Sequence, residues 1–116
     1  MIKLILGGRN NGKKDYLLGC GYTQDDFCTD FTGRILYKLN DVIKNNMDNE
    51  NVTEYVLEQV RDKDIIIVCD EVGCGIVPID KNENDYREKV GRCCCALAKT
   101  ADSVERVYSG IAAVIK

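Results

Sequence analysis

Apolar residues form continuous runs in some parts of this chain and helix-like spacings in others. The run Ile65–Cys69 contains no alternating polar residue, which is typical of a central strand buried on both faces. Ile2 and Leu4–Leu6 form another apolar segment, and Ser103–Tyr108 and Ile111–Ile115 form two more near the end. The pattern predicts a strand at each of these places.

Three further stretches repeat apolar residues at the spacing of an amphipathic helix. The first of them comprises Ile35, Leu36, Leu39, Val42 and Ile43. The second comprises Val52, Tyr55, Val56 and Val60. The third begins near Asn82 and comprises Tyr86, Val90, Cys93, Cys94, Leu97 and Ala101. We expect one helix for each.

Polar residues mark where these helices begin. Asp30 or Thr32 is a plausible N-cap for the first helix, because short polar side chains accept hydrogen bonds from the first backbone N–H groups. Asn51, followed by Glu54, predicts the start of the second helix. The polar, glycine-containing segment Gly19–Thr32 is predicted to be a connection.

The first strand runs directly into a Gly-x-x-x-x-Gly-Lys sequence, which is the pattern of a phosphate-binding loop. The loop glycines let backbone N–H groups turn toward an anion, and the brief helix expected at 16–18 adds the positive end of its dipole. Lys13 supplies a mobile charge. The predicted phosphate contacts are Gly7, Gly8, Arg9, Asn10, Asn11, Gly12, Lys13 and Lys14. The alternative is a strand–helix turn that binds nothing.

Lys14 departs from the complete motif, which ends in a Ser or Thr whose hydroxyl holds Mg²⁺. A lysine at this position could replace the metal with its own charge, or it could occupy the phosphate site itself. We therefore expect Mg²⁺ binding, if it occurs, to be weakened.

Asp70 and Glu71 directly follow the predicted central strand. Ligands of open α/β sheets bind at the carboxyl edge of the strands, where the phosphate loop also opens. Asp70 is accordingly a candidate Mg²⁺ ligand, and Glu71 could orient a water or hydroxyl. The alternative is a pair of solvated carboxylates that cap the following loop.

The order of strands, loop and helices predicts an α/β fold, namely a P-loop NTPase-like three-layer sandwich with a small, mostly parallel sheet. No repeat, linker or low-complexity tract divides residues 1–116. We expect a single P-loop nucleotide-binding domain.

The composition of the chain bears on which molecules it binds and on where in the cell it is found. The net charge of −3, with no basic stripe, argues against nucleic acid. No apolar run approaches the ~20 residues of a membrane span, and no signal peptide is recognised, so a cytoplasmic protein is expected. The chain has seven cysteines and no histidine, which favours reduced, partly buried thiols over a metal site.

A longer string, Asp70-Glu71-Val72-Gly73-Cys74-Gly75-Ile76-Val77-Pro78, resembles a segment of the adenosylcobinamide kinase / adenosylcobinamide-phosphate guanylyltransferase family. The downstream matches in order and spacing are Tyr86-Arg87-Glu88, Gly91-Arg92, Ala96-Leu97-Ala98, Ala101-Asp102, Val104, Ser109-Gly110 and Ile115-Lys116. The phosphate loop is similar to the Gly-Gly-x-x-x-Gly-Lys-Ser loop of the same family. The resemblance covers positions 2–18 and about 64–116.

This resemblance implies a place in cobalamin biosynthesis, with GTP or ATP as nucleotide and a corrinoid such as adenosylcobinamide as partner. It also implies that Glu71, Val72 and Gly73 line the nucleotide cleft, and family analogy suggests a homo-oligomer. Family members phosphorylate adenosylcobinamide and then transfer GMP through a guanylyl-histidine. This chain is shorter than family members and has no histidine, and Cys94 and Cys95 replace an Asn-Gln pair. The guanylyl-histidine route is therefore excluded for this polypeptide.

Three functional hypotheses follow from these observations. The first is a nucleotide-dependent kinase that acts on adenosylcobinamide. The second is a non-catalytic relative that binds a nucleotide or corrinoid as a binding or regulatory partner. The third is a remnant of the family kept for an unrelated interaction.

Overall fold

The computed structural model describes residues 1–8, 12–70 and 81–116. These residues form a six-stranded sheet with the order β2-β3-β4-β1-β5-β6. The strands are β1 (Ile2–Gly7), β2 (Phe27–Cys28), β3 (Ile35–Tyr37), β4 (Ile65–Asp70), β5 (Ser103–Tyr108) and β6 (Ile111–Val114). All neighbouring strands are parallel except β5 and β6. The predicted α/β fold with a mostly parallel sheet is confirmed.

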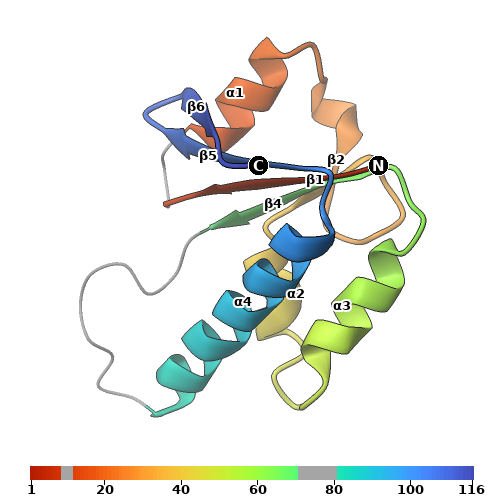
Figure 1. The fold of residues 1–116 in the computed structure, drawn as a ribbon, viewed down its shortest axis with the longest axis vertical. Coiled ribbons are helices and arrows are strands. Elements are labelled where there is room, and N and C mark those ends of the chain that lie inside the picture. The colour runs from red at the N-terminus through yellow and green to blue at the C-terminus, as the bar shows by residue number, and fades with distance from the viewer. Residues whose placement is uncertain (9–11, 71–80) are drawn as a thin grey trace.

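Helices cover both faces of the sheet, as Figure 1 shows. Helix α1 (Lys13–Gly19) lies on one face, while α2 (Leu39–Lys44), α3 (Val52–Val60) and α4 (Lys81–Thr100) lie on the other. Two separate hydrophobic clusters correspond to these two faces. The larger cluster fills the side of α2, α3 and α4, and it includes Val52, Val56 and Val60 of the apolar stripe predicted for the second helix. Tyr55, the fourth predicted member, is exposed instead.

Strand β4 lies between β3 and β1, and each of its six residues is buried. A strand covered by helices on both faces cannot alternate apolar with polar residues, which explains the continuous run of its sequence. The register pairs Gly7 of β1 with Asp70 of β4. Because the two strands are parallel and end level, this register brings the phosphate-loop sequence and Asp70 to the same edge of the sheet.

The prediction of a helix that starts at Ile35 was wrong for its first residues. Ile35 and Leu36 belong to strand β3, which pairs with β4 through Ile35↔Ile66 and Leu36↔Ile67, and α2 begins only at Leu39. Lys38, with φ of 70°, separates the two elements. The burial of both strand residues against β4 outweighs their helical spacing, because short apolar runs fit either period.

The segment 19–32, predicted to be a connection, contains the 3-10 turn η1 (Gln24–Asp26) and strand β2. The prediction that Asp30 or Thr32 caps a helix was wrong, because α2 begins only at Leu39. The Asp30 carboxylate instead accepts a hydrogen bond from the Thr32 N–H at 2.9 Å. Such local bonds stabilise turns rather than helix starts. Two residues suffice for β2 because it only extends the edge of an existing sheet.

Helix α1 is attached to the sheet by a polar contact as well as by Leu17. The hydroxyl of Tyr16 donates to a carboxylate oxygen of Glu105 on β5 at 2.6 Å. The other Glu105 oxygen lies 3.1 Å from Nζ of Lys3 on β1. This hydrogen bond and burial raise the pKa of Tyr16 above its ordinary value. The protonated phenol is thus the form that the folded chain stabilises.

Replacing Tyr16 with phenylalanine is expected to cost about 1 kcal/mol of unfolding free energy near pH 8. The folded pKa of Tyr16 is raised, so its contribution is complete below the unfolded value of about 10 and declines above it. Urea unfolding should show that the difference in unfolding free energy between wild type and variant is smaller at about pH 11 than near pH 8. Tyr55→Phe, on an exposed face of α3, should show no such gap, and a Tyr16→Phe gap independent of pH would contradict the assignment.

No helix in the described ranges is both long enough and apolar enough to cross a membrane.

Candidate functional site

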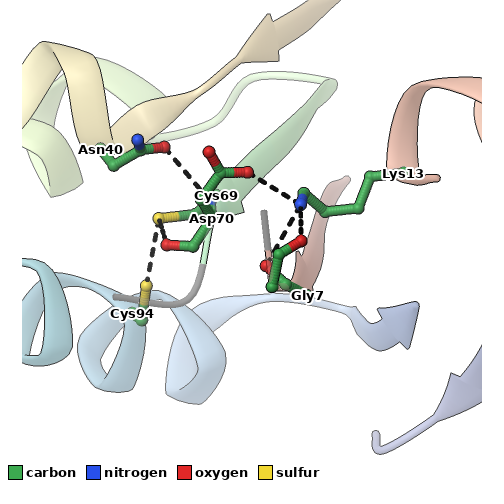
Figure 2. A network of polar contacts seen from close by, with 7 residues as sticks. Gly7, Lys13, Asn40, Cys69, Asp70 and Cys94 are labelled. Atoms are coloured by element: carbon green, nitrogen blue, oxygen red, sulfur yellow. Dashed lines mark hydrogen bonds and ion pairs between the residues drawn. The ribbon is translucent and has the colours of Figure 1, made fainter. Parts of the chain in front are cut away.

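Lys13 and Asp70 meet at the carboxyl edge of the sheet, as Figure 2 shows. The ammonium Nζ of Lys13 lies 2.8 Å from Oδ1 of Asp70. It also donates to the backbone oxygens of Gly7 at 3.1 Å and Gly8 at 2.8 Å. Lys13 is 5% exposed and Asp70 8%. The loop lysine is therefore held by three oxygens of its own chain, in a place largely shielded from water.

Two glycines allow the chain to pass from β1 into α1 in this form. A Cβ on Gly7 would lie 2.6 Å from the backbone oxygen of Val107 and 3.3 Å from Cδ of Lys13. Gly12 has φ of 81°, a left-handed conformation that few other residues adopt, and it directly precedes α1. The close packing at Gly7 and the turn at Gly12 place Lys13 over the end of β1.

Asn40 secures the end of β4 from the α2 side. Its side-chain oxygen accepts a hydrogen bond from the Asp70 N–H at 3.2 Å, and its backbone oxygen accepts one from the Tyr86 hydroxyl of α4 at 3.2 Å. Asn40 is buried, so these bonds replace those that water would make. Elements α2, β4 and α4 thus jointly hold the residue that binds Lys13.

Two thiols lie directly beside Asp70. The Sγ of Cys94 on α4 donates to the Sγ of Cys69 at 3.6 Å, and the Cys69 thiol faces the backbone oxygen of Asp70 at 3.5 Å (Figure 2). The hydrogen bond between the two thiols, together with burial, raises the pKa of Cys69 well above its ordinary range. The burial of Cys69 and the partial burial of Cys94 agree with the partly buried thiols predicted from the sequence.

Lys14 extends away from Lys13. Its ammonium lies 5.3 Å from the ring centroid of Phe27 and 5.5 Å from that of Tyr37, within the range of cation–π attraction. Lys38 places a second ammonium 5.6 Å from the Tyr37 ring. Both ammonium groups therefore lie against the Tyr37 ring of β3, and that of Lys14 also lies against the Phe27 ring of β2.

Several predicted site residues lie outside the described residues, namely Arg9, Asn10, Asn11, Glu71, Val72 and Gly73. The structure brings together Gly7, Gly8, Lys13 and Asp70, with Gly12 at the start of the helix. Across 1–8, 12–70 and 81–116, no three Cys, Asp or Glu side chains gather in a way that could hold a metal ion. Asp70 is the carboxylate of this site that could share a metal with bound phosphates.

Asn40, Cys69 and Cys94 were not predicted as parts of the site. Asn40 interrupts the apolar positions of α2 between Leu39 and Ile43, and a buried polar residue among apolar ones is a detectable signal. Nothing in the sequence indicates that Cys69 and Cys94 touch, because they come from different elements.

Comparison with protein-family models matches residues 25–115 to the model described as cobinamide kinase / cobinamide phosphate guanyltransferase. The matched segment is well over half of the chain and includes Asn40 and Asp70. It starts after Lys13. Among curated proteins, none matches the chain.

Proposed function

Because the chain belongs to the cobinamide kinase / cobinamide phosphate guanyltransferase family, we propose that it is a nucleotide-binding protein of cobalamin biosynthesis that resembles a cobinamide kinase. It binds GTP or ATP at the loop that starts at Gly7, with Lys13 against the outer phosphates. Since the chain contains no histidine, it does not perform guanylyl transfer through a guanylyl-histidine. Its acceptor is a corrinoid of the cobinamide type.

The observation that carries this proposal is the Lys13–Asp70 pair at the carboxyl edge of β1 and β4. A phosphate that enters the loop competes with Asp70 and with the oxygens of Gly7 and Gly8 for the ammonium. Once Lys13 turns to the phosphates, the Asp70 carboxylate would be free to serve as an oxygen ligand for Mg²⁺, which would supply positive charge to the phosphates.

Phosphoryl transfer in such a site depends on positioning and charge rather than on a covalent intermediate. The acceptor hydroxyl oxygen attacks the γ-phosphorus, the bond from that phosphorus to the β-phosphate oxygen breaks, and the hydroxyl proton leaves to a base or to solvent. Lys13 is suited to neutralise the charge on the transferred group. Asn40, which fixes the backbone of Asp70, would keep in place the carboxylate proposed to hold the metal.

The placement of Lys14 favours a second candidate, a non-catalytic relative that binds a nucleotide or corrinoid as a regulatory partner. Lys14 offers no hydroxyl to a metal, and its ammonium is directed to Phe27 and Tyr37. Among the described residues of this site, Asp70 is the one carboxylate, and without the hydroxyl of the complete motif we expect Mg²⁺ to be held more weakly. Such a protein binds nucleotide with little dependence on the metal.

Calorimetric titration with GTP and with ATP, each with and without Mg²⁺, tests the proposal. We expect binding that is lost in Lys13→Met and retained in Lys44→Met, a control at an exposed lysine of α2. Stronger binding with Mg²⁺, together with phosphate transfer to a cobinamide acceptor, supports the kinase. Nucleotide binding of equal affinity with and without Mg²⁺ supports the second candidate, and absence of nucleotide binding overturns both.

Lys14→Ser restores the hydroxyl of the complete motif and should increase the enhancement of nucleotide binding by Mg²⁺ roughly tenfold. The same calorimetry measures this, with Lys44→Ser as the control. An unchanged metal dependence in Lys14→Ser would contradict the role given to this position.

A further inference from the structure

We propose that Cys69 and Cys94 form a site of oxidative modification, which closes into a disulfide when a low-molecular-weight disulfide reacts with it, and that this bond weakens ligand binding at the Lys13–Asp70 pair. The first part of this inference stands on the thiol geometry alone. The second part rests on the proposed nucleotide-binding function.

The two sulfur atoms are already in contact. They lie 3.6 Å apart, and a disulfide needs about 2.05 Å, so a shift of roughly 1.5 Å between β4 and α4 closes the bond. Figure 2 shows both side chains directed toward each other from opposite sides of the gap between the strand end and the helix.

Neighbouring cysteines are placed differently. Cys95 is exposed, because adjacent positions of a helix point about 100° apart. Cys93 is buried and lies 3.3 Å from the hydroxyl of Thr53 on α3. Cys28 donates to backbone oxygens of Asp30 and Ile35. Among the described cysteines, Cys69 and Cys94 are the pair whose thiols are hydrogen-bonded to each other.

The exposure of the two thiols determines which of them reacts first with the small disulfide. Cys94 is half-buried, whereas Cys69 is fully buried, so the thiolate of Cys94 attacks one sulfur of the small disulfide and expels one thiolate. The thiolate of Cys69 then attacks the Cys94 sulfur of this mixed disulfide and expels the second. The two protein thiols are oxidised, the small disulfide is reduced to two thiols, and the two protons pass to those products.

The consequence for the site follows from the position of Cys69 next to Asp70. Closing the bond removes the Cys69 proton that faces the Asp70 backbone oxygen and pulls the strand end toward α4. Asp70 is held on its other sides by Asn40 and Lys13, so the pull disturbs both contacts. We expect nucleotide affinity to fall roughly tenfold, as for other displaced supporting groups.

The experiment treats the whole chain with oxidised glutathione and reads the result by intact mass and peptide mapping. We expect a cross-link between the peptides of Cys69 and Cys94, about 2 Da lighter than the two reduced peptides together, while the exposed Cys20 and Cys95 carry glutathione adducts. Cys95→Ser, the neighbouring control, should give the same cross-link. Cys94→Ser should give none, and Cys69→Ala should stop at a glutathione adduct on Cys94. An adduct that persists on Cys94 of the wild type, or a cross-link between other cysteines, overturns the site.

Calorimetry with GTP on the reduced, the oxidised and the re-reduced protein tests the coupling. Weaker binding after oxidation that returns on reduction, and that is absent in Cys94→Ser, supports it. A disulfide that forms without changing the affinity overturns the coupling. If the reduced protein binds no nucleotide, the proposed function and the coupling fail, while the cross-link still decides the modification site.

Discussion

Replacing Lys13 with methionine is expected to lower the free energy of unfolding by about 3 kcal/mol, in addition to abolishing nucleotide binding. The substitution keeps much of the volume of the side chain but removes the ammonium that lies 2.8 Å from the Asp70 carboxylate. The carboxylate remains at a position that is 8% exposed. A charge left without its partner in such a place is costly because the protein interior solvates it poorly.

Urea unfolding followed by far-ultraviolet circular dichroism measures this loss. Lys44→Met, at an exposed position of α2, should stay within about 0.5 kcal/mol of wild type. The double variant Lys13→Met/Asp70→Asn removes the charge as well as its partner and should regain much of the loss. If Lys13→Met is no less stable than Lys44→Met, the pair does not form in solution.

Replacing Gly7 with alanine is expected to cost about 3 kcal/mol. The new Cβ would lie 2.6 Å from the backbone oxygen of Val107, and that oxygen belongs to β5, the parallel neighbour of β1. This contact can be relieved only by separating the two strands, and Lys13, whose Cδ lies 3.3 Å from the same point, would have to shift as well. These changes disrupt the core and the site together.

Gly91→Ala is the matched control, because a Cβ at this position of α4 meets nothing within 4 Å. In a helix interior the same substitution should stabilise the protein by roughly 0.5–1 kcal/mol. Thermal and urea unfolding of the two variants should therefore move in opposite directions. Changes of the same sign and similar size would show that β1 and β5 do not pack as described.

The order of elements could be predicted from the sequence where the pattern was long or unmixed. Strands β1 and β4, helices α3 and α4 and the final pair β5 and β6 lie where the apolar pattern predicts them. The prediction was wrong at Ile35 and Leu36, because a short apolar run is compatible with both a helix and a strand. Only the neighbouring β4, which offers these residues a buried partner, decides between them.

The family could also be predicted from the sequence. The resemblance carried by the segment Asp70–Pro78 agrees with the family match over residues 25–115, so the suspected family is confirmed. The phosphate contacts and the magnesium ligand remain predictions, and part of that set lies outside the described residues. What the sequence could not provide is the partner of each charged group at the sheet edge.

The sequence by itself determined which segments become buried strands and where glycines and a lysine follow the first strand, because these properties depend on residue types at neighbouring positions. Tertiary structure alone decided that Lys13 binds Asp70, that Lys14 extends to Phe27 and Tyr37, and that Cys69 touches Cys94. Long side chains and buried thiols take whichever partners the packed strands and helices bring near. Those partners come from distant parts of the chain, where no local pattern specifies them.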